Sequence, residues 1–268
     1  MKIIKKFFTL LIVSFVLLGC SNAGTSSNEP LADEDFVLNV SRGLEARWVY
    51  TDKEDTTLMS TSELQDAYKK YIDAEKTTLG KMTDYEIKDE ELVKIAETYY
   101  KGLELQEEGI QYVGTDDYAN QLKTWDLGMN YRICAIHDLV EDFGLTVSSK
   151  YQSNIDDFMA QYKTAKKDVA VQEFVNTLPE KVTYTKNEEL SNEYSTIYTA
   201  IIENTTDVTI DSLQINADFL DANGVSVYQS VDYRNNLSPG AKVQSELYYE
   251  TEKGEVVSIN LTFDAYCE

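Results

Sequence analysis

Between residues 36 and 178 the apolar residues recur every three or four positions, a spacing typical of α-helices. One helix is expected to begin after Ser60, because Ser60 and Glu63 fit a capping box in which each residue binds the other's backbone N–H. A second is expected from Asp89 and another from Ser148. With the segment between them, the pattern predicts a bundle of about four helices over residues 35–179.

The segment between residues 118 and 143 has the clearest helical pattern. Its apolar residues alternate steps of four and three: Tyr118, Leu122, Trp125, Met129, Ile133, Ile136, Val140 and Phe143. Gly144 follows and suits a helix C-terminus. A second flank of this helix is also apolar, so we expect it to lie in the centre of the bundle.

After Pro179 the apolar period changes to two, which is typical of β-strands with one buried face. The inward positions of four expected strands are Leu213, Ile215, Ala217 and Phe219; Val225, Val227, Val231 and Tyr233; Val243, Ser245, Leu247 and Tyr249; and Val257, Ile259, Leu261, Phe263 and Ala265. An earlier strand is expected over 197–204. Residues 180–268 are therefore predicted to form an antiparallel β-sandwich, and the whole chain an α+β protein of two domains.

The strand region also contains a recognisable set of turn residues. Asn204 precedes a strand, residues 217–221 are followed by Gly224, and residues 237–240 read Leu, Ser, Pro, Gly. This arrangement resembles the FxLYD domain of exported bacterial proteins, although Ala217 and Leu220 replace its aromatic and its tyrosine. The resemblance implies an immunoglobulin-like sandwich with no assigned catalytic activity.

The first twenty residues have the composition of a secretion signal. Three lysines precede an apolar run of about a dozen residues, which is too short for a stable membrane span. The run ends in Leu17, Leu18, Gly19 and Cys20, which resembles the lipobox of bacterial lipoproteins. The resemblance implies that residues 1–19 are removed and that Cys20 carries the lipid. We therefore expect a protein held by a lipid anchor on the extracytoplasmic face of the cell membrane, with residues 20–34 as a flexible tether.

The net charge of the chain limits the classes of partner that it can bind. Residues 1–19 hold three lysines and no acid, so the remaining chain has 21 Lys and Arg against 47 Asp and Glu, a net charge of −26. Such a field repels phosphate-rich polymers, so we expect no nucleic-acid partner. No phosphate-binding or dinucleotide-binding glycine motif occurs in the sequence, and we expect no cofactor.

Residues for catalysis are scarce. His137 is the one histidine of the chain, and a serine or cysteine hydrolase would need it as its base. Two interpretations of His137 with Glu141 are open: half of a metal site, or a surface ion pair. We prefer the ion pair. We therefore predict no catalytic residues, no metal ligands and no enzymatic activity.

Two cysteines remain after Cys20. Cys134 lies on the central helix, and Cys267 follows the inward positions of the last strand. An oxidising compartment permits a disulfide between them. The alternative is a pair of small, separately buried thiols, and the spacing does not choose between the two.

Two functions from different classes fit these observations. The first is a non-enzymatic envelope lipoprotein that offers a surface to a protein or cell-wall partner. The second is a receptor lipoprotein that binds a small ligand or cation for uptake or sensing.

Overall fold

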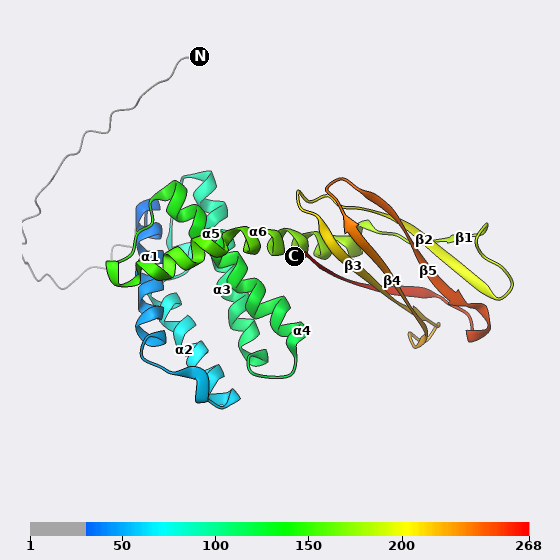
Figure 1. The fold of residues 1–268 in the computed structure, drawn as a ribbon, viewed down its shortest axis with the longest axis horizontal. Coiled ribbons are helices and arrows are strands. Elements are labelled where there is room, and N and C mark those ends of the chain that lie inside the picture. Colours follow the sequence, from blue (N-terminus) through cyan, green and yellow to red (C-terminus); the bar gives the residue numbers. More distant parts are fainter. Residues whose placement is uncertain (1–30, 268) are drawn as a thin grey trace, which may run out of the picture. The chain divides into compact units, whose positions relative to one another are not determined.

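The computed structural model describes residues 31–267, which form a helical part followed by antiparallel strands (Figure 1). The helices are α1 (Asp33–Thr51), α2 (Thr61–Leu79), α3 (Glu90–Gly109), α4 (Tyr118–Gln121), α5 (Leu127–Phe143) and α6 (Gln152–Lys181). The strands are β1 (Thr185–Asn187), β2 (Ser195–Glu203), β3 (Ile210–Leu220), β4 (Ser226–Leu237), β5 (Lys242–Glu250) and β6 (Ser258–Tyr266). The predicted α+β class is confirmed. None of the described helices combines the length and the apolar character needed to cross a bilayer.

Local signals set several helix ends as the sequence predicts. Ser60 and Glu63 form the capping box at the start of α2, with the Ser60 N–H donating to Glu63 Oε2 at 2.8 Å. The Asp89 carboxylate accepts the backbone N–H groups of Glu91 and Leu92 at the start of α3. Gly144 ends α5 with a left-handed φ of +68°, a conformation that costs glycine little.

The chain joins the fold earlier than the predicted tether allows. Residues 1–30, with Cys20 and the lipobox, lie outside the described part. Leu31 pairs with the segment around Tyr85, and α1 begins at Asp33, whose carboxylate accepts the N–H of Lys88 at 2.8 Å. Residues 31–34 are therefore part of the fold, and the predicted tether end at residue 34 is wrong. Because α1 precedes the four expected helices, the bundle has five long helices in the described region.

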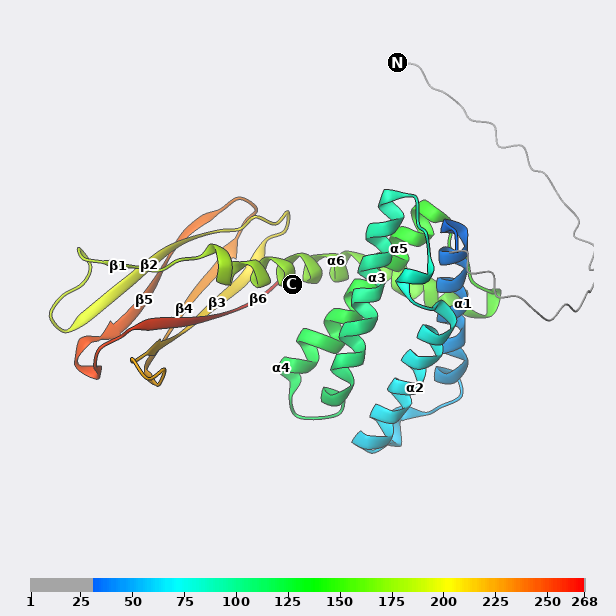
Figure 2. The same ribbon diagram turned by 180° about the vertical axis from the view of Figure 1, so that it is seen from behind.

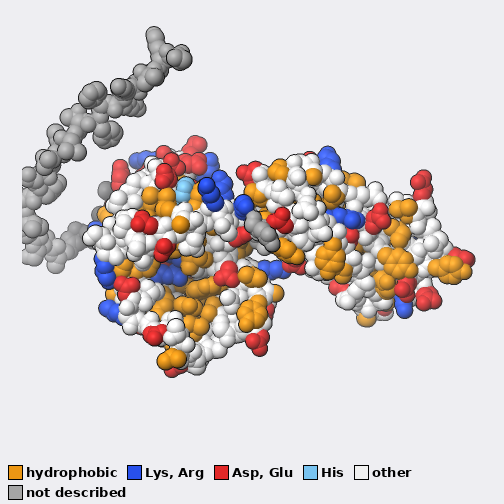
Figure 3. Space-filling model, viewed as in Figure 1, with side chains coloured by type: hydrophobic (Ala, Val, Ile, Leu, Met, Phe, Trp, Pro, Cys, Tyr) orange, Lys and Arg blue, Asp and Glu red, His pale blue; other side chains and the backbone are white. Residues whose placement is uncertain are grey.

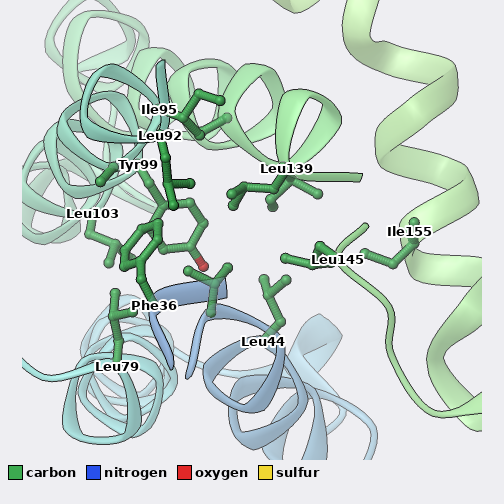
Figure 4. Close-up of a cluster of buried hydrophobic side chains, with 14 of the residues drawn as sticks. Phe36, Leu44, Leu79, Leu92, Ile95, Tyr99, Leu103, Leu139, Leu145 and Ile155 are labelled. Carbon is green, nitrogen blue, oxygen red and sulfur yellow. The ribbon is translucent and has the colours of Figure 1, made fainter. Parts of the chain in front are cut away.

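The core of the helical part lies where α1, α2, α3 and α5 meet. α1 packs against α2, α3 against α5, and α5 against α6. Phe36, Leu79, Tyr99 and Leu139 converge on one another from four helices, and Leu145 and Ile155 extend this core toward α6 (Figure 4). Burial of these apolar side chains is the main stabilising term of this part of the molecule.

A π-helical turn over Leu122–Asp126 joins α4 to α5. A π turn adds a residue to one turn, so the positions before it are rotated by about 100° relative to a continuous α-helix. Tyr118 and Leu122 are consequently 65% and 62% exposed, and their predicted place on the buried stripe is wrong. The backbone of α3 comes very close here, because a Cβ on Gly109 would lie 2.5 Å from the Trp125 nitrogen.

α6 contributes to two cores. Its first turns bury Ile155 in the helical core, whereas Val171, Phe174, Val175 and Leu178 pack into the core of the strands. The helix also continues through Pro179 to Lys181. The packing therefore changes from one core to the other before the change of apolar period that suggested the boundary at residue 179.

The strands form two three-stranded antiparallel sheets, in the orders β1-β2-β5 and β4-β3-β6 (Figure 2). Their inward side chains share one core that includes Ile215, Phe219, Leu247, Tyr249 and Phe263. These residues lie on the faces that the alternating pattern predicts.

The inward face of β4 was predicted wrongly beyond its bulge, whereas Val227 packs against the core of the strands as predicted. A bulge between Phe219 and Leu220 shifts the pairing of β3 with β4 by one residue, and a shift of one residue exchanges the two faces of a strand. Val231 and Tyr233 therefore lie opposite the outward Asn216 and Gln214, and both are exposed.

The same shift turns Asp232 toward β5. Its carboxylate accepts the backbone N–H of Glu246, and the Ser230 hydroxyl accepts the N–H of Tyr248. Side chains of β4 thus occupy backbone donors on the edge of β5 that does not pair with β2.

Asn204, part of the FxLYD-like pattern, is a fully buried amide between β2 and β3. Its Nδ2 donates to the carbonyls of Val208 and Leu237 at 2.9 and 2.8 Å, and its Oδ1 accepts the N–H of Thr206. It therefore satisfies three backbone groups of the surrounding loops.

We expect Asn204→Ala to lower the free energy of unfolding by about 1–3 kcal/mol, because the buried Leu237 carbonyl loses its Asn204 donor. Urea denaturation of the variant checks this value. Asn223→Ala, at an exposed turn position, is the control and should change stability by less than about 0.5 kcal/mol. Equal losses in both variants would contradict the role given to Asn204.

Candidate functional site

Three charged side chains lie in the interior of the helical part. Arg47 of α1, Glu75 of α2 and Arg132 of α5 are only 6%, 0% and 1% exposed. Each occupies an apolar stripe of its helix, so helix packing brings the three together. Buried charges are costly unless they are paired and hydrogen-bonded, which makes this cluster the most unusual feature of the described chain.

The Glu75 carboxylate is fully used as an acceptor. Arg132 Nη2 donates to its two oxygens at 2.6 and 2.8 Å, and Arg47 Nη1 donates to Oε2 at 3.1 Å. The Tyr99 hydroxyl donates to Oε1. Gln106 Oε1 accepts from Arg47 and from Arg132, at 3.1 and 3.0 Å, and so bridges the two guanidinium groups.

The cluster carries one excess positive charge. Burial raises the pKa of Glu75, but the guanidinium groups of Arg132 and Arg47 outweigh this effect and hold the pKa below its usual value. Burial and the charge of Arg132 lower the pKa of Arg47, although a guanidinium stays protonated near neutral pH. Burial and Glu75 raise the pKa of Tyr99, so its hydroxyl is neutral. Two cations therefore face one anion.

Some donors of the guanidinium groups have no acceptor among the described residues. Arg132 Nε is buried and has no hydrogen-bond partner there. Arg47 uses Nη1 for both of its bonds, to Glu75 and to Gln106, which leaves its Nε and Nη2 for another acceptor. A buried unpaired donor costs about 1–3 kcal/mol, more when it is charged.

Arg47 and Arg132 line a pocket of about 410 Å³ between α1, α2, α5 and α6. Its other lining residues are Trp48, Thr51, Tyr68, Tyr71, Trp125, Met129, Asn154, Asp157, Phe158 and Gln161. Figure 3 shows, on one face of the helical part, hydrophobic side chains gathered beside a small patch of Lys and Arg. The pocket thus combines apolar walls with convergent polar groups, as small-molecule sites commonly do.

The aromatic walls are held by contacts with one another. The rings of Tyr68 and Trp125 stack with centroids 4.7 Å apart and an interplanar angle of 24°. Trp48 packs against Phe158, with ring centroids 6.1 Å apart. The π-helical turn contributes here, because it sets the rotation of Trp125 relative to the exposed α4.

Two glycines allow α3 and α5 to approach closely enough to place Arg132. A Cβ on Gly102 would lie 2.6 Å from Arg132 Cγ and 2.7 Å from the Gly128 carbonyl oxygen. A Cβ on Gly128 would lie 2.7 Å from the Gly102 carbonyl oxygen. Only a hydrogen atom fits at these positions without a backbone shift.

The residues singled out from the sequence lie elsewhere. His137 contacts its neighbour Asp138, with Nδ1 2.9 Å from Oδ1, and its ring stacks on Tyr162. The pairing of His137 with Glu141 is therefore replaced by these two contacts. Between residues 31 and 267 no three His, Cys, Asp or Glu side chains are grouped so that they could hold a metal ion.

The structure holds Cys134 and Cys267 as free thiols, so the bridge considered between them is not formed. Cys267 Sγ lies 3.8 Å from Asp168 Oδ1. Burial raises the pKa of Cys134 to about 12, with a further contribution from Asp138, so this thiol is protonated and a weak nucleophile at neutral pH.

Sequence reasoning missed Arg47, Glu75 and Arg132. A signal was present, since Glu75 continues the spacing of Tyr68, Tyr71 and Ile72 on the apolar stripe of α2. Charged residues of opposite sign at core positions of different helices indicate a buried ion cluster.

Comparison with known proteins adds no assignment: no family model matches the chain, and neither a curated protein nor a solved structure matches it.

Proposed function

We propose that this protein is a non-enzymatic receptor lipoprotein, anchored outside the cell membrane, whose helical pocket binds a small anionic ligand. The observation that carries the proposal is the pair of guanidinium groups that line the pocket and share one buried carboxylate. A receptor lipoprotein of this kind is the second of the two functions that fit the sequence. A surface for a protein or wall partner stays a prediction.

Electrostatics favours an anion in this pocket. The cluster keeps one uncompensated positive charge, and the Nε and Nη2 atoms of Arg47 take no part in its bonds to Glu75 and Gln106. An anion in the pocket would neutralise the charge and accept from these atoms hydrogen bonds that are roughly twice as strong as bonds between neutral groups. The acidic surface of the chain makes the positive pocket more distinctive.

The shape of the pocket favours a small molecule. A volume of about 410 Å³ falls within the roughly 300–1,000 Å³ range of small-molecule sites. Trp125 and Phe158, both half-buried, offer apolar surface that a ligand would remove from water. The pocket therefore supplies both affinity through apolar burial and selectivity through charge.

A thermal-shift screen of the full chain in mild detergent tests ligand binding. Saturating small organic anions should raise the unfolding midpoint, because a ligand that binds only the folded state stabilises it. Trp125→Ala should remove the shift, whereas Tyr118→Ala, at an exposed aromatic residue outside the pocket, should retain it. Equal shifts in both variants would place the binding outside the pocket, and no shift with any anion would contradict the proposal.

The anchor has its own expected result. Cells that express the protein should incorporate labelled palmitate into it, and Cys20→Ser should remove the label and release the protein from membranes. Two acyl chains bind far more firmly than the marginal attachment of one, so the difference should be large. Cys134→Ser is the matched control and should remain labelled. An unlabelled parent protein would contradict the lipid anchor but not ligand binding.

A further inference from the structure

We infer that the pocket takes a monocarboxylate joined to a flat aromatic or apolar body; this rests on the proposed function and specifies its ligand. The inference follows from four features of the pocket: its charge, its free donors, its walls and its mouth.

The charge of the cluster matches a single negative charge. Arg47 and Arg132 contribute two positive charges, Glu75 one negative charge, and Tyr99 none. A carboxylate brings the total of these buried groups to zero, whereas a phosphate dianion leaves an excess negative charge away from water. Asp157 also lines the pocket, but its side chain is exposed, so water screens its charge. Because uncompensated charge is costly in a buried site, the balance favours a monoanion.

The free donors also suit a carboxylate. Arg47 makes both of its bonds through Nη1, so its Nε and Nη2 atoms remain as a planar fork, and a planar carboxylate meets such a fork with two parallel hydrogen bonds. Glu75 shows that a carboxylate pairs with these guanidinium groups, although both of its oxygens accept from one nitrogen, Arg132 Nη2. A ligand carboxylate would use the guanidinium atoms that Glu75 does not reach.

The walls select the body of the ligand. Trp125 and Phe158 present half-buried aromatic surface, and Met129 of α5 adds a polarisable thioether. A flat ring would gain contact with these groups, whereas a sugar or an extended polyanion would leave its polar groups against apolar walls. The walls therefore favour an aromatic or compact apolar acid.

The mouth of the pocket disfavours a second negative charge. Asn154, Asp157 and Gln161 line the pocket from α6, at a spacing that places them on one face of the helix, and Asp157 and Gln161 are exposed to solvent. The two amides can bind an amide or hydroxyl at the outer end of the ligand, and Asp157 repels a second carboxylate. An aromatic acid and the C-terminal residue of a peptide share this chemistry.

Isothermal titration calorimetry of the full chain with four probes tests the inference. The probes are 3-phenylpropionate, its primary amide, phenyl phosphate and glycyl-phenylalanine. We expect the carboxylate to bind at least about tenfold more tightly than the neutral amide and the phosphate, because only it neutralises the cluster. Tighter binding of glycyl-phenylalanine than of 3-phenylpropionate would assign the carboxylate to a peptide terminus, and the reverse to a small aromatic acid.

Arg47→Met supplies the decisive variant. It leaves Glu75 paired with Arg132 in a neutral cluster, so it is expected to fold and to lose the preference for carboxylate over amide. Arg42→Met, at an exposed position on the same helix, is the matched control and should keep the preference. Arg47→Lys retains the charge and should keep part of the preference for carboxylate over amide. Trp125→Ala should weaken binding of the carboxylate and of the amide alike.

The outcomes separate the two claims. Tightest binding of phenyl phosphate would overturn the monocarboxylate and leave an anion receptor in place. Equal binding of amide and carboxylate, unchanged by Arg47→Met, would overturn both claims. Absence of saturable binding by all four probes would also overturn both.

Discussion

Replacement of Glu75 by glutamine is expected to lower the free energy of unfolding by about 3–5 kcal/mol, among the largest effects of a single change in this chain. The carboxylate is completely buried and accepts from Arg47, Arg132 and Tyr99. A glutamine of the same shape cannot neutralise two guanidinium groups, so two cations would remain in the interior. Urea denaturation at neutral pH measures the loss, provided that the slope of the transition is unchanged.

The control is an exposed ion pair between α2 and α3. Glu107 pairs with Lys76, but both side chains are substantially exposed, so Glu107→Gln should cost less than about 1 kcal/mol. Adding Arg47→Met to Glu75→Gln should recover stability, because it removes one of the unpaired cations. A loss below about 1 kcal/mol for Glu75→Gln would show that the charges of the cluster are not strongly coupled.

The pH dependence of the free energy of unfolding follows from the Glu75 carboxylate. The folded-state pKa of Glu75 lies below its usual value, so its contribution to stability is fully present above that usual value and disappears as the pH falls through the folded-state pKa. The parent protein should therefore lose more stability than Glu75→Gln over this acidic interval. Denaturation curves at a series of pH values check the sign.

The second large effect is expected for Gly128→Ala. The added Cβ would lie 2.7 Å from the Gly102 carbonyl oxygen and 2.8 Å from the Gln106 nitrogen, both of them backbone atoms of the helix packed against α5. Because backbone cannot yield as a flexible side chain does, α3 and α5 must separate. We expect a net loss of about 2 kcal/mol or more, although alanine favours a helix by roughly 1 kcal/mol over glycine.

The same separation should disturb the pocket, since Arg132 and Gln106 lie on the two helices that move apart. Gly128→Ala should therefore also weaken ligand binding measured by calorimetry. Glu141→Ala, at an exposed position of α5, should change neither stability by more than about 0.5 kcal/mol nor ligand affinity. Unchanged stability of Gly128→Ala would mean that the two helices do not require this close approach.

Sequence patterns predicted those features of the fold that local chemistry determines. The capping residues Ser60 and Asp89 and the glycine at 144 mark helix ends through contacts within a few residues. The π-helical turn before α5 and the bulge after Phe219 escaped prediction, because each inserts one residue into a regular period. Their effect is a rotation or an exchange of faces, which exposes Leu122 and Val231 despite their apolar spacing.

The candidate site depends on tertiary packing more than the helix ends do. Arg47, Glu75 and Arg132 are separated by 28 and 57 residues in sequence, and each alone reads as an isolated charge on an apolar stripe. Only the packing of α1, α2 and α5 shows that the three charges compensate one another and that two of them line a pocket. Spacing within one helix cannot supply that information.

The arrangement of β4 and β5 has a consequence for behaviour at high concentration. An open sheet edge offers free N–H groups on which a strand from another molecule can assemble into aggregates or fibrils. On β5 the N–H groups of Glu246 and Tyr248 are already bound by Asp232 and Ser230. This edge is therefore a poor template for such growth. At high protein concentration we expect no intermolecular sheet to form along β5.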